Sequence, residues 1–280
     1  MILKLTLRRS LSDSSLALRV SKSLLSSTDL FTMDFRTPGF LNLAMLCAIC
    51  VSPPAARALE FRTVTFVGKR ATVCVVDLRK DQLRLFLSDE SGRKLKSFAA
   101  LAQWMATQNR QLIFAMNAGM FEPGYSPVGL FISGGQKLAP LNLNAGPGNF
   151  YLKPNGVFAI TQTGAMVVES SRFEAIPGPV MLATQSGPLL VQNGQIHPAL
   201  QPDSRSRLCR NGVGVATPDQ VVFAISEDPV NLHEFASLFR DGLHCPNALY
   251  LDGTISSLYA PSLGRDDRKT DLGPIIGVVK

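Results

Sequence analysis

Four segments of the sequence combine polar side chains with glycine beside an apolar run, namely residues 114–122, 148–156, 204–214 and 248–257. Open β-sheets often place their sites where strands end. The polar groups in these segments are carboxylates, guanidinium groups, amides and hydroxyls. Such groups can transfer protons or bind anions and sugars, so the four segments are the candidates for a functional site.

The segment 248–257 contains the best-placed carboxylate. Asp252 ends a mostly apolar run and precedes Gly253, and the hydroxyls of Ser256 and Ser257 follow. A carboxylate at the end of a strand can act as a general acid or base, or as a metal ligand. An Asp-Gly hairpin turn accounts for the same residues. The segment therefore predicts either a catalytic carboxylate or a turn.

Three arginines, Arg205, Arg207 and Arg210, lie within six residues of one another beside glycine-bearing backbone that includes Gly214. The guanidinium group can bind two oxygens of a phosphate at once. Arg210 is the best candidate for an anion ligand because it lies next to the apolar run. A solvated loop is the better interpretation for Arg205 and Arg207.

The other two segments offer amide side chains. Asn117 ends an apolar run, and Gly119 lets the backbone turn tightly after it. Asn149 lies beside aromatic residues and could line a sugar site, whereas Asn155 precedes Gly156 as in a hairpin turn. Ordinary turn chemistry explains both segments, so their part in binding is a hypothesis.

A second carboxylate could come from Glu227, at the end of the run 221–226, or from Glu122. The sequence has three histidines, none at metal-ligand spacing, and it lacks Gly-x-Ser-x-Gly, His-Glu-x-x-His and phosphate-loop motifs. We therefore expect no metal site and no cofactor. The one reservation is that Asp252 with nearby backbone carbonyls could hold Ca²⁺.

Short apolar runs rich in Val, Ile and Phe dominate residues 59–280, and most have the length of a strand. The expected strands are 64–67, 72–77, 83–87, 112–116, 128–132, 157–160, 181–184, 189–192, 213–216, 221–226, 248–251, 257–260 and 275–279.

Two helices are expected among these strands. Ser97 can cap the first, and Asn231 with Glu234 three residues on has the pattern of a capping box for the second. The second helix joins the runs 221–226 and 248–251 in a strand–helix–strand unit. Two helices among a dozen strands predict an α+β fold, a single domain built on a large mixed β-sheet with a few helices.

The first 58 residues resemble a targeting segment. Residues 33–58 contain a basic start, an apolar stretch from Phe40 to Val51 and the small-x-small pattern Ala56-Arg57-Ala58, as in a signal peptide. Residues 1–32 are a doubtful N-terminal extension, with Met33 as an alternative first residue. We expect an exported protein, periplasmic or secreted after cleavage near Ala58, with residues 59–280 as its domain.

The net charge is +7 over 280 residues, which raises the question of a nucleic-acid partner. Seven of the 28 basic and three of the 21 acidic residues lie in the first 58, so residues 59–280 carry only +3. We therefore expect no nucleic-acid partner. No apolar run reaches the roughly 18 residues of a membrane-spanning helix, so we expect no membrane span either.

Three cysteines follow the predicted signal peptide. Cys74 lies in an apolar run and is expected to be a buried core thiol. Cys209 and Cys245 each stand just before a strand-like run, and neighbouring strands would bring them together. In an oxidising compartment we expect a Cys209–Cys245 disulfide.

Taken together, the segments resemble the phosphodiester glycosidase family, and in part a bacterial branch of it. That family carries an Asn-Gly-Gly-Phe-Phe-like segment, an Arg four residues before a Gly, and Leu-Asp-Gly-Gly-x-Ser near the C-terminus. The counterparts here are Asn117–Phe121, Arg210 before Gly214, and Leu251–Ser257, within a similarity that spans roughly residues 110–280. Residues 148–158 and 185–189 resemble the bacterial branch.

The sequence departs from the family pattern at Ala118, Met120 and Thr254-Ile255, which predicts a different pocket and substrate. The resemblance implies an exported hydrolase that cleaves the glycosidic bond of a sugar-1-phosphodiester, either a small molecule or a polysaccharide. In that reaction Arg210 would neutralise the phosphate, and Asp252 would activate water or stabilise an oxocarbenium-like centre.

The resemblance also implies roles for other residues. Asn117, Ser256 and Ser257 would orient sugar hydroxyls or phosphate oxygens, with Glu227 or Glu122 as an open choice for a second carboxylate. The remaining substrate-binding candidates are Gly119, Asn149, Asn155, Gly214 and Gly253.

Two alternatives stay open. The first is a non-catalytic glycan- or phosphosugar-binding domain of the same fold. The second is a metal-dependent phosphodiesterase that breaks P–O bonds, which the lack of histidines at ligand spacing disfavours.

Overall fold

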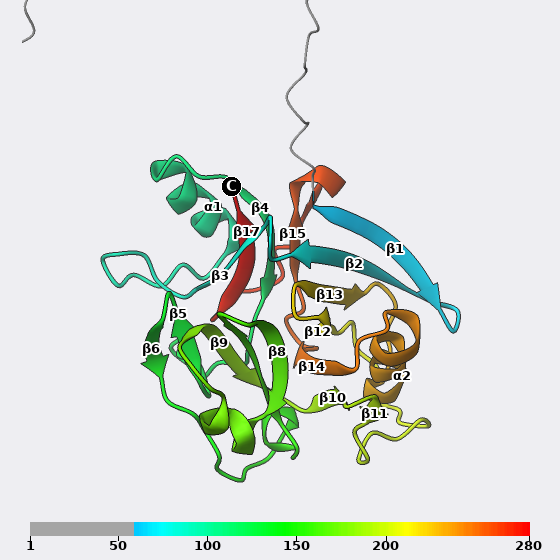
Figure 1. The fold of residues 1–280 in the computed structure, drawn as a ribbon. Helices are drawn as coiled ribbons and strands as arrows, with labels where there is room; N and C mark the ends of the chain where they lie inside the picture. The colour runs from blue at the N-terminus through cyan, green and yellow to red at the C-terminus, as the bar shows by residue number, and fades with distance from the viewer. Residues whose placement is uncertain (1–58) are drawn as a thin grey trace, which may run out of the picture. The chain divides into compact units, whose positions relative to one another are not determined.

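Three antiparallel β-sheets form the framework of residues 59–280, the part of the chain that the computed structural model describes (Figure 1). Every hydrogen-bonded strand pair among these residues is antiparallel. The expectation of one large mixed sheet is therefore wrong, and the α+β expectation becomes a mostly β fold. The predicted signal peptide and N-terminal extension lie outside the described residues.

The largest sheet has seven strands and carries two of the four polar segments singled out above, 204–214 and 248–257. In spatial order its strands are β1 (Glu60–Phe66), β2 (Lys69–Asp77), β13 (Gln220–Ser226), β12 (Asn211–Thr217), β14 (Asn247–Asp252), β10 (Leu189–Gln192) and β11 (Gln195–Ile196).

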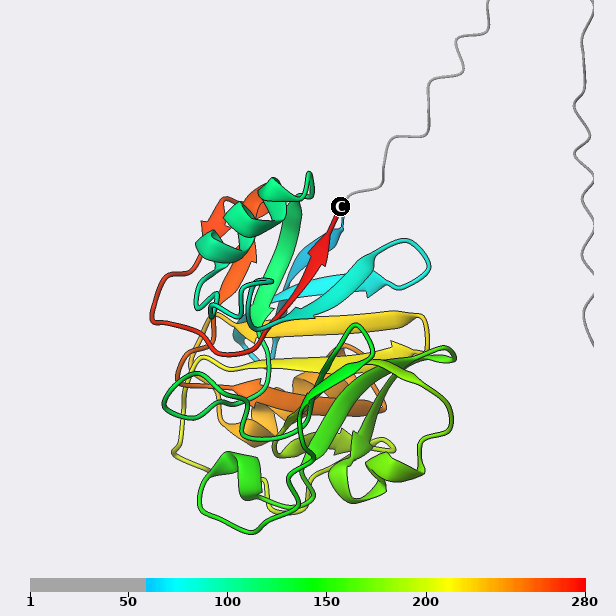
Figure 2. The same cartoon turned by 90° about the vertical axis from the view of Figure 1, so that its left-hand side faces the viewer.

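Two five-stranded sheets complete the fold. One consists of β16 (Arg265–Asp266), β15 (Leu258–Ala260), β4 (Leu112–Asn117), β17 (Ile275–Val279) and β3 (Gln82–Phe86). The other consists of β6 (Gln136–Ala139), β5 (Phe131–Ser133), β9 (Val180–Ser186), β7 (Gly156–Thr161) and β8 (Gly164–Glu169). Figure 2 shows β12–β14 between these two sheets.

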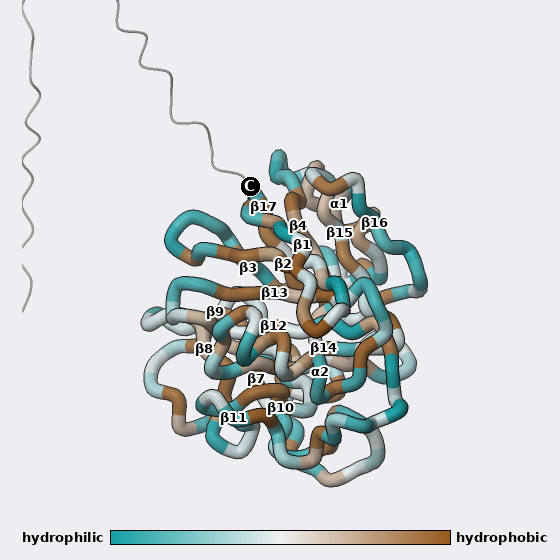
Figure 3. Tube along the Cα trace, turned by 90° about the vertical axis from the view of Figure 1, so that its right-hand side faces the viewer, coloured by the Kyte–Doolittle hydropathy of each residue, from teal (hydrophilic) through white to brown (hydrophobic). Residues whose placement is uncertain are grey.

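The main hydrophobic core lies where the three sheets meet. Phe114 of β4, Phe158 of β7 and Phe223 of β13 are fully buried there. The ring centroid of Phe223 lies 5.1 Å from that of Phe114 and 6.2 Å from that of Phe158. Figure 3 shows the same division along the chain, with hydrophobic strands and mostly hydrophilic connections. Burial of these apolar strand faces is what holds the sheet ends, and the polar groups on them, in place.

Both predicted helix caps are confirmed. Helix α1 (Phe98–Thr107) begins after Ser97, whose hydroxyl accepts a hydrogen bond from the Ala100 N–H at 3.1 Å. Helix α2 (Leu232–Ser237) begins with the complete capping box of Asn231 and Glu234 and continues into a π-helical turn, Leu238–Gly242. None of the helices in residues 59–280 is long and apolar enough to cross a membrane.

All thirteen expected strands overlap an observed strand, and four strands were not predicted: β6, β8, β11 and β16. β11 and β16 have two residues each, and β6 is mostly exposed and lacks an apolar run. The expected strand–helix–strand unit runs from β13 through α2 to β14. Because β12 pairs with both strands, β13 and β14 are parallel to each other yet never hydrogen-bonded.

The expected Cys209–Cys245 disulfide is wrong for this structure, in which both thiols are free. The two cysteines do precede neighbouring strands, β12 and β14. These strands are antiparallel, with Asn211 opposite Asp252 and Val215 opposite Asn247. The residues before the two strands therefore lie at opposite ends of the pair. Cys74 is buried in the core, as expected.

Candidate active site

Three of the four polar segments meet at one end of the central strands. Asn117 ends β4, Asn211 begins β12 and Asp252 ends β14. Asn211 lies opposite Asp252 at an irregularity in the ladder, and it hydrogen-bonds Asn117 across the gap between two sheets. Antiparallel pairing thus brings together residues that are far apart in the sequence.

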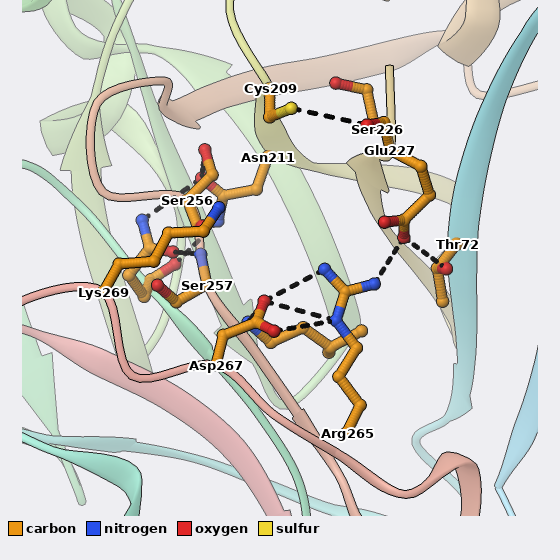
Figure 4. A network of polar contacts seen from close by, with 12 residues as sticks. Thr72, Cys209, Asn211, Ser226, Glu227, Ser256, Ser257, Arg265, Asp267 and Lys269 are labelled. Atoms are coloured by element: carbon orange, nitrogen blue, oxygen red, sulfur yellow. Dashed lines mark hydrogen bonds and ion pairs between the residues drawn. The ribbon is translucent and has the colours of Figure 1, made fainter. Parts of the chain in front are cut away.

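A buried polar cluster forms at this point, and we call Asn117, Asn211, Ser256 and Ser257 the Asn–Ser cluster. The Asn117 Nδ2 donates to Asn211 Oδ1 at 3.1 Å, and the Asn211 Nδ2 donates to the Asn117 carbonyl at 3.0 Å. The Ser257 N–H donates to Asn117 Oδ1 at 2.9 Å, and the Ser256 hydroxyl lies 3.2 Å from Asn211 Oδ1 (Figure 4). All four residues are at most 2% exposed.

The partners of the Asn–Ser cluster are all within the protein. Its bonds join β4 to β12 and hold the loop that follows β14, which carries both serines. Asn117 and the two serines therefore hold the loop after β14 in place. Buried polar groups joined in this way are costly to disturb, because each broken bond leaves a group without a partner.

Asp252 lies between this cluster and the arginine segment. One of its carboxylate oxygens, Oδ1, accepts the backbone N–H groups of residues 253, 254 and 255 at 2.6, 2.6 and 3.0 Å. Its backbone carbonyl accepts the Ser256 hydroxyl at 3.0 Å. No hydrogen bond from residues 59–280 reaches the other carboxylate oxygen, Oδ2. The carboxylate is therefore held in one orientation while one oxygen stays available.

Arg210 is a buried cation, 1% exposed, directly before β12. Its Nε donates to the Val230 carbonyl at 2.8 Å, and its Nη2 donates to the Ser206 carbonyl at 2.8 Å. Its Nη1 donates to the Tyr250 hydroxyl at 2.9 Å. All of these acceptors are neutral, and Arg210 forms no ion pair with a carboxylate of residues 59–280. Such an unbalanced buried charge favours the approach of an anion.

Arg210 and Asn211 point to opposite faces of the large sheet, because side chains alternate along a strand. Arg210 and Tyr250 contact the α2 side, where Tyr250 belongs to the second core cluster. Asn211 contacts Asn117 on the other side. Asp252, two residues after Tyr250, is at the strand end where the two groups meet.

Glu227 has a different setting. Its carboxylate forms an ion pair with Arg265 and accepts the Thr72 hydroxyl at 2.6 Å (Figure 4). Arg265 also pairs with Asp267 at 2.9 Å, and Asp267 accepts the Leu258 N–H at 2.9 Å. This chain of contacts ends at the first residue of β15, directly after Ser257. Through Arg265 and Asp267, Glu227 therefore helps to hold the end of the loop that follows β14.

Two of the expected binding glycines are sites of close packing. A Cβ on Gly119 would lie 2.4 Å from the Gln185 carbonyl oxygen, where the end of β4 meets β9. A Cβ on Gly214 would lie 2.8 Å from Cys245 Sγ and from Phe239 Cδ1, beneath the α2 segment. Gly214 therefore packs against Cys245 and Phe239 and lies apart from the Asn–Ser cluster. Its small size serves the packing of the helical turn on β12.

The remaining candidates are spread around the site. Gly253 lies beside Arg210, since a Cβ there would be 3.1 Å from Arg210 Nη1. Asn149 is exposed in a 3₁₀ turn (Asn149–Tyr151) and its side chain approaches the Tyr250 hydroxyl. Asn155 is buried and donates to the Phe150 carbonyl at 2.8 Å, which holds the same turn. Glu122 is exposed in a hairpin turn.

Sequence reasoning missed Asn211, Tyr250, Arg265, Asp267 and Lys269. Lys269 donates to the Ser256 carbonyl at 3.0 Å from an exposed loop. Only Tyr250 had a usable signal, because it lies two residues before Asp252 on the same strand. The partners of the other residues depend on how the sheets meet.

The candidate Ca²⁺ site at Asp252 has no support from neighbouring ligands. Across residues 59–280, no group of three or more His, Cys, Asp or Glu side chains is placed to hold a metal ion. Asp252 Oδ1 is also taken by backbone N–H groups. We derive no metal chemistry from this site.

Comparison with known proteins shows the family of the chain. A family model described as phosphodiester glycosidase matches residues 110–276, which include β4, β12 and β14. The Escherichia coli (strain K12) protein YigE, described as uncharacterized, is 34% identical over 184 residues, covering 66% of this chain and 72% of YigE.

A similar fold occurs in a solved structure. The catalytic domain of zebrafish N-acetylglucosamine-1-phosphodiester alpha-N-acetylglucosaminidase, auto-inhibited by its pro-peptide, aligns with a TM-score of 0.56. It is 15% identical, and the alignment covers 79% of this chain and 81% of the zebrafish chain. At this identity the likeness concerns the fold. The family match spans more than half of the chain, and the chain belongs to the phosphodiester glycosidase family.

Proposed function

We propose that this protein is a hydrolase that cleaves the glycosidic bond of a sugar-1-phosphodiester. Water adds to the anomeric carbon, the bond from that carbon to the phosphate oxygen breaks, and free sugar and a phosphate monoester leave. Family membership supports this reaction class, and the site offers groups suited to it.

The observation that carries the proposal is the buried Arg210 guanidinium next to the strand end that bears Asp252. Its charge has neutral hydrogen-bond acceptors and no carboxylate partner in residues 59–280. A phosphate group supplies the missing negative charge. Because a phosphate monoester is a good leaving group, neutralising its charge contributes more than protonating it, and a cation suits that task.

Asp252 is the carboxylate that we propose acts at the anomeric carbon. Three backbone N–H groups hold its Oδ1, which fixes the direction of Oδ2. A carboxylate in this position can take a proton from the attacking water or stabilise positive charge at the anomeric carbon. Restraint of the carboxylate before the reaction lowers the reorganisation needed during it.

In this proposal the Asn–Ser cluster and Glu227 position the Asp252 loop and do not contact the reacting atoms. Asn117 and the two serines bind one another and Asn211, so they set the path of the loop after Asp252. Glu227 is paired with Arg265 and is therefore not a free proton donor. The mechanism we propose thus uses one carboxylate, Asp252, and one cation, Arg210.

The test is hydrolysis of UDP-N-acetylglucosamine and simple sugar-1-phosphodiesters by the purified protein, with products separated by chromatography. We expect wild type to release free sugar and Asp252→Asn, which keeps the size of the side chain, to lose at least about 100-fold in rate. Asp203→Asn, at an exposed position, is the matched control and should retain full activity. Release of sugar-1-phosphate would instead indicate cleavage of a P–O bond and contradict the proposal.

One observation favours a second candidate, a non-catalytic domain that binds glycans or phosphosugars. The three bonds to Asp252 Oδ1 also describe an ordinary loop cap. The same variants separate the two functions. A binding domain would release no sugar, and its affinity for the phosphosugar would survive Asp252→Asn.

We also propose that residues 59–280 act outside the cytoplasm as one domain. The signal-peptide pattern of residues 33–58 supports this. N-terminal sequencing of protein recovered from cell fractions tests it, and the expected mature chain begins at Leu59. Full-length protein retained in the cytoplasm would contradict this part of the proposal.

A further inference from the structure

Tyr250 has an unusual position for a tyrosine of a β-strand core. Its side chain belongs to the buried cluster beneath α2 and is 1% exposed, yet its hydroxyl accepts the Arg210 Nη1 N–H at 2.9 Å. The phenol therefore carries a polar group next to the buried positive charge. Neither the family pattern nor the sequence segments assigned it a role.

In residues 59–280 the Tyr250 hydroxyl has two side-chain partners, the buried Arg210 and the exposed Asn149. The hydroxyl oxygen accepts from Arg210, and a tyrosine hydroxyl also has one proton to donate. The Arg210 Nη1 has two N–H groups, of which one is used in that bond. A phosphate oxygen that replaced the Asn149 side chain could therefore accept hydrogen bonds from both the phenol and the guanidinium.

The neighbours of the Tyr250 hydroxyl are loop backbone and one exposed side chain. A Cβ on Gly253 would lie 2.3 Å from the Tyr250 hydroxyl oxygen, so the backbone of the Asp252 loop packs directly on it. On the other side the exposed Asn149 side chain approaches the hydroxyl. Asn149 is the exposed one of these neighbours, so an acceptor from solvent would reach the pair by replacing its side chain. The acceptor that enters should be anionic, because the guanidinium charge is unbalanced.

We propose that Tyr250 is a specificity-determining residue that donates its O–H to an oxygen of the substrate phosphate beside Arg210, with Asn149 as the movable cover. This rests on the proposed function and deepens it by naming the groups that select a phosphodiester over a neutral glycoside. Tyr250 binds the phosphate in both substrate and product. It transfers no proton.

Burial supports this role, because it raises the pKa of Tyr250 to about 12. The phenol therefore keeps its proton at neutral and mildly alkaline pH. A protonated phenol can donate a hydrogen bond and adds no negative charge that would repel phosphate. The anion affinity should accordingly show no loss from tyrosine ionisation below about pH 10.

The test is calorimetric titration of the purified protein with inorganic phosphate. Tyr250→Phe removes one oxygen atom and keeps the ring, and we expect it to weaken phosphate binding by roughly 10-fold, about 1.4 kcal/mol. Tyr259→Phe removes the same atom from a residue that forms no side-chain hydrogen bond within residues 59–280, and it should leave the affinity unchanged. Equal affinity of Tyr250→Phe and wild type, or no phosphate binding by wild type, would overturn the proposal.

A second variant guards against misfolding of the first. Gly253→Ala places a methyl group where the hydroxyl lies and pushes it away from Arg210, while the phenol stays intact. We expect a loss of phosphate affinity similar to that of Tyr250→Phe. Unchanged affinity in Gly253→Ala, with a normal melting temperature, would contradict the geometry on which the proposal depends.

The two proposals can fail separately. Release of free sugar with the same kcat/KM in wild type and Tyr250→Phe would leave the proposed function standing and reject the role of Tyr250. Tyrosine-dependent phosphate binding without turnover of any sugar phosphodiester would support the anion site and reject the hydrolase.

Discussion

Asn117→Ala tests whether the Asn–Ser cluster holds the sheets and the Asp252 loop together. The substitution removes the bond from Asn117 Nδ2 to Asn211 Oδ1, at 3.1 Å, and the bond from the Ser257 N–H to Asn117 Oδ1, at 2.9 Å. Each bond contributes about 0.5–1.5 kcal/mol, and the buried Ser257 N–H left without an acceptor costs more. We expect a total loss of about 2–4 kcal/mol in the free energy of unfolding.

Urea denaturation followed by circular dichroism measures this loss, since the midpoint falls in proportion to the free energy of unfolding. Asn144→Ala is the matched control, because Asn144 is exposed and its side chain forms no hydrogen bond within residues 59–280. It should change stability by less than about 0.5 kcal/mol. If Asn117→Ala loses no more than Asn144→Ala, the reasoning about the cluster is wrong.

A double-mutant cycle with Asn211→Ala sharpens the same test. Asn117 and Asn211 share two hydrogen bonds, so their effects should not add, and the coupling should be about 0.5–3 kcal/mol. The catalytic rate of folded Asn117→Ala should also fall, because the loop that orients Asp252 loses an anchor. Strict additivity would show that the two asparagines act independently.

Three further predictions concern packing, thiols and pH. Gly214→Ala places a Cβ 2.8 Å from Cys245 Sγ, so calorimetric melting should show a loss of about 1–3 kcal/mol in the free energy of unfolding. The activity per folded molecule should stay unchanged, and a loss of this activity would instead place Gly214 in the active site. Burial raises the pKa of Cys74 well above its usual range and that of Cys245 to about 12. In native protein the thiol reagent DTNB should therefore modify Cys209 alone among these three cysteines. If Cys209 reacted with DTNB only after treatment with a reductant, the result would support the Cys209–Cys245 disulfide. Burial lowers the pKa of His197, so the unfolded chain takes up this proton first as the pH falls, and the free energy of unfolding decreases below about pH 6.5. His197→Gln should flatten this dependence in urea titrations at several pH values, whereas His244→Asn, at an exposed position, should not.

The strands and helix caps could be predicted from the sequence because their signals are local. Apolar runs rich in Val, Ile and Phe identified most long strands of the core, although not β8, and the Asn231–Glu234 capping box was visible as two residue types at a fixed spacing. The pairing of strands has no such signal. An apolar run does not indicate its partner or direction, which is why a mixed sheet and a disulfide were wrongly expected.

The candidate site could be predicted only in part, for the same reason. Asp252, Arg210 and Asn117 were found as polar groups at the ends of apolar runs. Asn211 was missed because its importance depends on a partner 94 residues away in another sheet. The close packing around Gly214 could not be predicted, because the sequence does not reveal that a helical turn packs on that strand. Pairing between distant segments, and not residue type, decided which polar residues came together.

The most direct test of the central claim is the fate of oxygen-18 when the purified protein hydrolyses a sugar-1-phosphodiester in labelled water. Attack at the anomeric carbon, with Arg210 neutralising the departing phosphate and Asp252 assisting the water, predicts that the label appears in the free sugar. Mass spectrometry of both products measures this. Label in the phosphate, with none in the sugar, would mean that the P–O bond is cleaved and would contradict the account.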